Sequence, residues 1–239
     1  MNLQYFKISG QGKRDYNEDA FFIDAGSSLF MVCDGVGGSN RGDIASKKAC
    51  EYFSGYLLEK NRFTQSDIEK SLQETERGFD EYIAKNPEAS GMATTLTFLK
   101  LDDGNGIAGH IGDSRIYQVR NGEILFMTSD HSFVNELVAS GFLTEEEARV
   151  HPKRNQITRA IQGSENSTLI DVDLIKSIEN GDYFLLCSDG ILEGIDNKWI
   201  ENNFTSANSL ENIENGIKEN CLKKSSDNYT AIVIQITNI

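Results

Sequence analysis

Two stretches of the chain share a pattern in which a run of large apolar residues ends abruptly in an acidic residue and a glycine. The first is LFMVCDG at residues 29–35, and the second is YFLLCSDG at residues 183–190. Short continuous apolar runs of this kind are typical of buried strands. A carboxylate at the end of such a run is costly to desolvate unless cations or several donors meet it. The two stretches therefore raise the question of what else converges at these strand ends.

Further apolar or alternating runs predict additional strands. The expected strands cover residues 20–24, 29–33, 93–101, 107–111, 115–119, 124–127, 168–174, 183–187 and 230–236. Asn121-Gly122 predicts a tight hairpin between two of them. Strands cluster, helices follow, and more strands come after, with more hairpins than crossovers. This order favours an α+β layered sandwich with mainly antiparallel sheets over a doubly wound parallel sheet.

Apolar residues at helical spacing predict three longer helices, over residues 44–57, 68–83 and 210–221. Ser66 and Glu69 have the spacing of a capping box at the start of the second. A short helix is expected to close at Gly141, and another to begin at Thr144 with Glu147 as its capping partner.

Composition and charge narrow the class of protein. With 239 residues and 38% hydrophobic content, the chain can form one domain with a sizeable core. The formal net charge of -14 disfavours nucleic acid as a partner. Neither a signal peptide nor an apolar run long enough for a membrane span is evident, so a cytoplasmic protein is expected. The four cysteines, widely spaced, are expected to be reduced core residues: Cys33, Cys50, Cys187 and Cys221.

Acidic residues recur at the ends of five predicted strands. They are Glu18-Asp19, Asp34-Gly35, Asp113, Asp189-Gly190 and Asp227-Asn228. Carboxylates from several strand ends can share one site, where Mg²⁺ or Mn²⁺ would compensate their mutual repulsion. Each Asp-Gly pair alone is more often a turn. Five acidic clusters at apolar strand ends make coincidence a poor explanation.

Seven sequence blocks together resemble a known enzyme family. They are RDYNEDAFF, VCDGVGG, GMATTLTFL, GHIGDSRIY, a long block from Asp130 to Gly163, LLCSDGI and SDNYTAIVI. In order and character they are similar to the bacterial branch of the metal-dependent type 2C serine/threonine protein phosphatases. The resemblance extends from about Arg14 to Ile236. It implies a four-layer α-β-β-α sandwich with two mainly antiparallel central sheets, spanning residues 1–239 as a single catalytic domain.

The resemblance also implies roles for individual residues. Arg14 matches the arginine that binds the substrate phosphate, and its planar fork suits that task. Asp113 matches a position that can hold a third ion. The positions that hold two Mn²⁺ or Mg²⁺ ions are matched by Asp34, the carbonyl of Gly35, Asp189 and Asp227, with Glu18 and Asp19 acting directly or through water. Such a pair of ions would activate water for direct attack on phosphoserine and phosphothreonine monoesters.

The same resemblance leads to expectations about partners and about a flap. Residues from about Thr144 to Gln162 correspond to a mobile flap beside the site. Phosphorylated proteins are the expected substrates, a bacterial serine/threonine kinase is the expected counterpart, and a monomer is expected. No nucleic acid or membrane partner is expected.

The chain departs from many eukaryotic relatives at Val36, where they have a histidine proposed as general acid. A metal-bound water molecule would then have to protonate the leaving group. The three histidines do not obviously replace it: His110 and His131 are expected in core or surface roles, and His151 lies in the flap.

Two alternative functions are weighed against this one. A cysteine phosphatase requires Cys-x₅-Arg, but the positions six beyond the cysteines are Ser39, Tyr56, Glu193 and Asp227. The more serious alternative is a non-catalytic module on the same fold that binds phosphoproteins. Such a module should have lost acidic ligands, whereas every matched ligand position here is acidic or, at Gly35, supplies a carbonyl.

Overall fold

Two five-stranded sheets form the centre of the protein. The computed structural model describes residues 1–36, 41–60 and 63–239. One sheet has the order β1 (Asn2–Gly10), β10 (Tyr229–Asn238), β9 (Tyr183–Cys187), β6 (Arg115–Arg120), β7 (Glu123–Met127). The other has the order β2 (Asp19–Asp24), β3 (Leu29–Asp34), β4 (Leu96–Asp102), β5 (Asn105–Ile111), β8 (Asp171–Ile175). All pairings between these strands are antiparallel.

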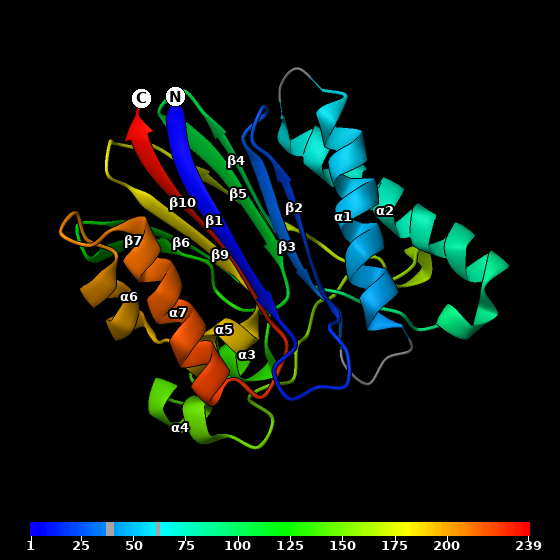
Figure 1. Ribbon diagram of the computed structural model, residues 1–239. Coiled ribbons are helices and arrows are strands. Elements are labelled where there is room, and N and C mark those ends of the chain that lie inside the picture. Colours follow the sequence, from blue (N-terminus) through cyan, green and yellow to red (C-terminus); the bar gives the residue numbers. More distant parts are fainter. Residues whose placement is uncertain (37–40, 61–62) are drawn as a thin grey trace.

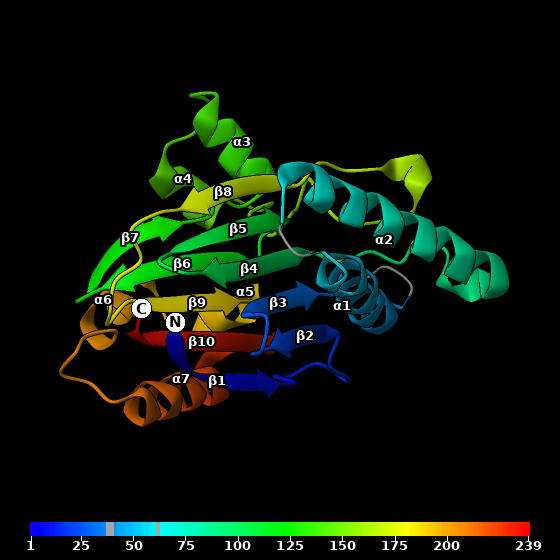
Figure 2. The same ribbon diagram turned by 90° about the horizontal axis from the view of Figure 1, so that it is seen from above.

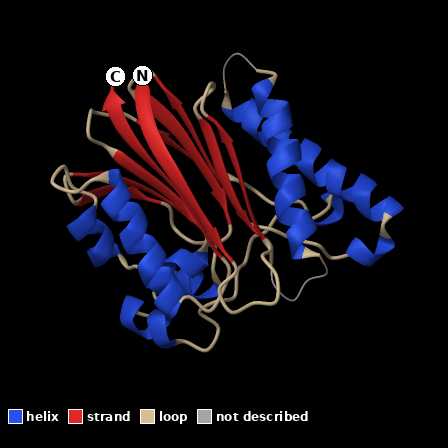
Figure 3. Cartoon of the chain, in the orientation of Figure 1, coloured by secondary structure: helices blue, strands red, loops and turns tan. Residues whose placement is uncertain are grey.

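Helices cover the outer face of each sheet (Figures 1 and 3). The β2–β8 sheet is covered by α1 (Gly42–Leu58) and α2 (Gln65–Lys85). The β1–β7 sheet is covered by α5 (Asp189–Gly194), α6 (Asn197–Asn203) and α7 (Leu210–Lys224). The short helices α3 (Phe133–Ala139) and α4 (Glu145–Val150) and the 3₁₀ turn η2 (Ser164–Asn166) lie between β7 and β8 in sequence, and a second 3₁₀ turn, η1 (Pro87–Ala89), lies between α2 and β4. The predicted four-layer α-β-β-α sandwich is confirmed.

Three apolar cores fill the spaces between the four layers, and strands β3 and β9 each contribute to two of them. In β3, Leu29, Met31 and Cys33 pack towards α1 and α2, while Phe30 and Val32 pack between the sheets. Strand β9 alternates in the same way, with one set of side chains towards α5–α7 and the other between the sheets. Because successive side chains point to opposite faces, a strand buried on both sides must be apolar throughout. This explains the two continuous runs in the sequence.

Several local predictions are confirmed. Asn121 and Gly122 both have positive φ, 48° and 80°, as the two-residue turn between β6 and β7 requires. The Thr144 capping box is present, and Gly141, at φ 74°, follows α3. All four cysteines are buried and free. Among the described residues, no helix is both long and apolar enough to cross a membrane.

Other local predictions were incomplete or wrong. Strand β1 was not predicted, because Ile8 is its one fully buried residue and its stability comes from pairing with the distant β10. Helices α5 and α6 were also missed. The capping box of α2 is formed by Thr64 and Asp67 instead of Ser66 and Glu69, since the helix already begins at Gln65.

Candidate metal centre

The acidic strand ends predicted from the sequence meet in one cavity of about 180 Å³. Strands β3 and β9, one from each sheet, contact each other; β3 ends in Asp34, and β9 is followed after one residue by Asp189. The loop after β1 and the loop before β10 arrive at the same place because those two strands pair. The cavity is lined by Arg14, Glu18, Asp34, Gly35, Val36, Thr95, Asp113, Asn155, Ile157, Asp189 and Asp227.

Asp19 is the one predicted site residue that does not line the cavity. It pairs with Asp34 across β2 and β3, and it is buried. Its Oδ2 accepts a hydrogen bond of 2.8 Å from Ser188 Oγ, while its Oδ1 is buried with no hydrogen-bond partner. Asp19 therefore lies directly behind the residues that line the cavity.

Burial and mutual repulsion raise the pKa values of four of the aspartates, Asp19, Asp34, Asp113 and Asp189. Burial, followed by Asp19 and Asp189, raises the pKa of Asp34 well above its ordinary value. Burial, followed by Asp113 and Asp227, raises the pKa of Asp189 to about 8. The pKa of Asp113 and that of Asp19 both rise to about 6, in each case mainly through burial. The acidic side chains of the cavity carry more negative charge than its basic side chains balance.

Arg14 is the cation among the described residues that line the cavity, and its guanidinium is directed at Asp227. Nε and Nη2 donate to the two carboxylate oxygens at 2.8 and 2.5 Å, a bidentate pair. This hydrogen bonding is the main reason that the pKa of Arg14 is raised. The Arg14 side chain nevertheless remains 53% exposed, so that it is accessible at the mouth of the cavity.

The backbone around Glu18 and Gly35 is packed too closely for larger residues. Gly35 N donates to Glu18 O at 3.2 Å. A Cβ on Gly35 would lie 2.3 Å from the carbonyl oxygen of Gly42 and 2.8 Å from that of Glu18, so glycine is required there. Asn228 Oδ1 accepts from Glu18 N at 2.8 Å and so ties the start of β2 to the Asp227 loop. The pKa of Glu18 is raised, first by burial and then by Asp43.

The residues present fit hard divalent cations. All the acidic donors are oxygens, the class that Mg²⁺ and Mn²⁺ prefer. Two carboxylate oxygens, Asp19 Oδ1 and Asp189 Oδ1, are buried without any hydrogen-bond partner. Orphaned carboxylate oxygens are costly unless something positive meets them. Cations at this position would satisfy those atoms and balance the excess negative charge.

Several residues that shape the cavity have no role that their sequence pattern predicts. Thr95 lines it, and Thr95 Oγ1 accepts a hydrogen bond of 2.9 Å from Asp34 N. Asn155 and Ile157 line it from the segment expected to form a flap. Thr95 belongs to one of the blocks that carry the resemblance, but its type and spacing alone gave no chemical signal. The sequence positions of Asn155 and Ile157 indicated only that they are near the site.

Comparisons with known proteins agree with this arrangement. A model of the family described as "Protein phosphatase 2C" matches residues 9–223. Protein phosphatase PhpP of Streptococcus pneumoniae is 36% identical over 212 residues, which cover 86% of this chain and 85% of that protein. The crystal structure of the serine/threonine phosphatase PstP/Ppp of Mycobacterium tuberculosis has a TM-score of 0.86 and 28% identity, and the match covers 99% of both chains.

A further solved structure bears on the metal. It is the catalytic domain of the serine/threonine protein phosphatase PstP in complex with two manganese ions, with a TM-score of 0.76, 27% identity and 99% of both chains covered. Family match, fold and an oxygen-rich cavity all point in one direction: the chain belongs to the protein phosphatase 2C family of metal-dependent serine/threonine protein phosphatases.

Proposed function

We propose that this protein hydrolyses phosphoserine and phosphothreonine monoesters in proteins, with water as the nucleophile. The observation that carries the proposal is the convergence of five carboxylates and one accessible arginine on a single cavity. Two bound Mn²⁺ or Mg²⁺ ions would lower the pKa of water and neutralise phosphoryl oxygens. The chain supplies the ligands for them and a cationic group for the substrate.

We assign the ligands from their places around the cavity. Asp34, Asp189, Asp227 and the carbonyl of Gly35 are proposed to hold the two ions. Glu18 and Asp19 are proposed to contribute directly or through water; the unpartnered Oδ1 of Asp19 supports this assignment. Asp113, on the same cavity, is proposed to help hold a third ion.

Arg14 is proposed to bind the substrate phosphate. A guanidinium presents parallel donors that match two oxygens of a phosphate, and it stays charged at any working pH. The bidentate pairing with Asp227 holds the group in place before a substrate arrives. An arginine so oriented needs only a small displacement to share its donors with a phosphate at the mouth.

Proton supply to the leaving alkoxide is proposed to come from water. No histidine is among the described residues that line the cavity, and Val36 occupies the position at which many eukaryotic members of the family have a histidine. His110 and His131 are both buried. Their hydrogen bonds are made to other groups of the protein: His110 bonds to the Ser129 carbonyl, and His131 bonds to the Gly112 amide and to Asp171.

We propose that residues 144–162 form a flap that contacts large substrates, within a single catalytic domain covering residues 1–239. The position of Asn155 and Ile157 on the cavity supports this. Phosphoproteins produced by a serine/threonine kinase are the proposed substrates, and the protein is proposed to act as a monomer.

The test is turnover of a phosphopeptide and of p-nitrophenyl phosphate after complete chelation and after addition of Mn²⁺ or Mg²⁺. We expect turnover to be abolished by chelation and restored by either ion. Asp34→Asn should abolish it, whereas the exposed Asp173→Asn on β8 serves as a matched control that retains it. Stoichiometric phosphopeptide binding without turnover at any metal concentration would instead establish the non-catalytic alternative.

A further inference from the structure

His131 lies where three segments of the chain meet beside the cavity. Its backbone N donates to the carbonyl of Gly112 at 2.9 Å, and Gly112 N donates back to His131 Nδ1 at 3.1 Å. From the other side, Thr158 N donates to the carbonyl of His131 at 2.8 Å. One residue therefore joins the turn that carries Asp113 to the final part of the proposed flap.

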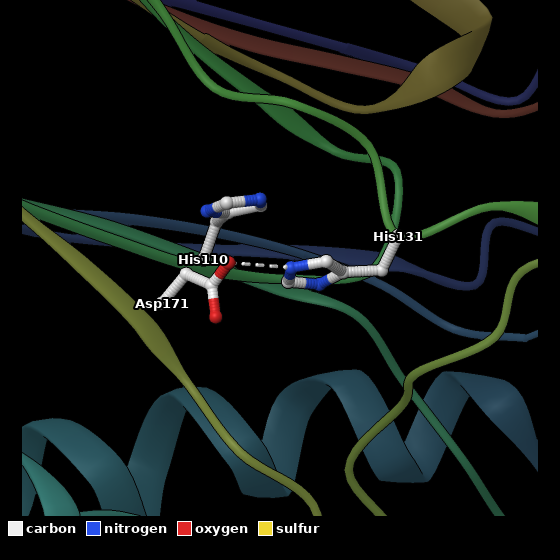
Figure 4. Close-up of side chains that lie close together, drawn as sticks. All are labelled: His110, His131 and Asp171. Carbon is white, nitrogen blue, oxygen red and sulfur yellow. Dashed lines mark hydrogen bonds and ion pairs between the residues drawn. The ribbon is translucent and has the colours of Figure 1, made fainter. Parts of the chain in front are cut away.

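The outer edge of the His131 ring contacts strand β8. Nε2 lies 3.1 Å from Asp171 Oδ2, and Arg159 Nη1 donates to Asp171 Oδ1 at 2.7 Å. Figure 4 shows His131 directed at Asp171, with His110 alongside. The His131 ring thus has two separate hydrogen-bonding edges, one towards Gly112 and one towards Asp171.

The same three side chains, His110, His131 and Asp171, have the residue types of a metal site, and their donor atoms lie within 4.8 Å of one another. Their geometry argues against one. The two imidazole rings are stacked, with centroids 4.4 Å apart and planes 13° from parallel, so their in-plane lone pairs do not converge. Arg159 Nη1 also lies 3.2 Å from His131 Nε2, where a cation would have to approach. The cluster is better explained as a hydrogen-bonded support.

The bond from Gly112 requires a neutral imidazole. Nδ1 accepts a hydrogen bond from a backbone N–H, so it carries no proton, and Nε2 then carries the proton that it shares with Asp171. Burial lowers the pKa of His131 and, with smaller contributions from His110 and Arg159, outweighs the opposing hydrogen bond to Asp171; this favours the neutral form. The tautomer is therefore determined by groups on both sides of the ring.

The turn that His131 contacts is tightly constrained. Gly112 has a φ of 97°, and a Cβ there would lie 2.6 Å from Thr95 Cγ2. Ser114 Oγ lies 2.7 Å from Thr95 Oγ1, the same oxygen that accepts from Asp34 N. A shift of this turn would move Asp113, which lies between Gly112 and Ser114, relative to Asp34.

We propose that His131 is a positioning residue that holds Asp113 at the cavity through the Gly112 N–H···Nδ1 hydrogen bond. This inference rests on the proposed function, because it assigns His131 to the geometry of that site. It goes further in giving a role to a histidine that does not line the cavity. The hydrogen bond to Asp171 serves to orient the ring.

Two substitutions separate the two edges of the ring. His131→Asn places an amide oxygen near the position of Nδ1 and keeps an acceptor for Gly112 N–H, but it cannot reach Asp171. His131→Gln reaches the position of Nε2 and keeps the contact with Asp171, but it leaves Gly112 N–H without its acceptor. Asp171→Asn is the matched control, because it keeps the histidine and its bond to Gly112.

The first measurement is hydrogen exchange of the Gly112 amide by NMR in the full chain. It does not depend on activity. We expect His131→Gln to accelerate exchange on the order of tenfold or more, as for loss of one hydrogen bond, while His131→Asn and Asp171→Asn retain protection. The second measurement is Mn²⁺-dependent kcat/KM on a phosphopeptide, with thermal melting to verify folding. We expect His131→Gln to lose about 10–100-fold, and the other two variants to lose much less.

Equal losses of kcat/KM in His131→Asn and His131→Gln would overturn the proposal. They would show that packing of the ring matters and that its Nδ1 acceptor does not. Unchanged Gly112 protection in folded His131→Gln would overturn it too. If His131→Gln does not fold, a large loss of Gly112 protection or activity in His131→Asn still refutes the idea. Lack of metal-dependent turnover in the unaltered protein would refute the proposed function, a distinct outcome that leaves the exchange result standing.

Discussion

Replacing Asp189 by asparagine should stabilise the metal-free protein, although it removes a proposed ligand. The pKa of Asp189 rises from an ordinary 3.8 to about 8, mainly through burial and then through Asp113 and Asp227. Since one pKa step corresponds to about 1.4 kcal/mol, ionised Asp189 costs the folded state roughly 6 kcal/mol. An amide of the same shape avoids this cost. We expect a gain on the order of 3–6 kcal/mol, because water entering the cavity relieves part of the cost in the unaltered protein.

The gain should depend on pH in a defined direction. Between pH 3.8 and about 8 the folded protein binds more protons at Asp189 than the unfolded chain does, so stability falls as pH rises through that window. The advantage of Asp189→Asn should therefore be small near pH 4 and complete above pH 8. Saturating Mn²⁺ should reverse the order of stability and make the unaltered protein more stable than Asp189→Asn. A ligand that binds only the folded state stabilises the protein with the better site.

Urea denaturation of fully chelated protein, followed by circular dichroism at pH 5 and pH 8.5, measures this difference. Asp173→Asn is the control, because it removes one negative charge from an exposed position on β8. An equal gain in the control would show that net charge alone is responsible. No gain for Asp189→Asn at pH 8.5 would refute the reasoning from burial and repulsion.

Three further predictions concern activity. Arg14→Lys should lower kcat/KM on a phosphopeptide about 10–100-fold, the worth of a bidentate charged contact, and steady-state kinetics showing no loss would contradict its assigned role. Asp113→Ala should slow a phosphopeptide more than p-nitrophenyl phosphate, since an alkoxide needs a proton more than a phenolate does; equal slowing in parallel assays would count against a third-ion role. Asn155→Ala should change discrimination among phosphoproteins by several-fold and leave aryl phosphate turnover nearly unaltered, and comparable effects in both assays would argue against a flap.

The sequence predicted those parts of the structure whose pattern is set by residues close together in the chain. The runs ending at Asp34 and Asp189 indicated buried strands because both faces of β3 and β9 are covered. Strand β1 was missed since its partner lies more than two hundred residues away and only Ile8 is fully buried. For the same reason the role of His131 was not foreseen. Its contacts come from residues distant in sequence, and no residue type or spacing predicts them.

The pairing of β1 with β10 has a practical consequence for joining other proteins to this one. Asn2 lies opposite Asn238, so that both ends of the chain emerge side by side (Figure 2). The opposite ends of the same two strands, at Gly10 and Tyr229, lead into the loops of Arg14 and Asp227. Nine residues of strand separate the two places, roughly 30 Å. A reporter or affinity tag at either terminus would therefore lie far from the mouth of the cavity, where phosphoproteins must enter. Because the two termini are adjacent, both could be attached to the same surface.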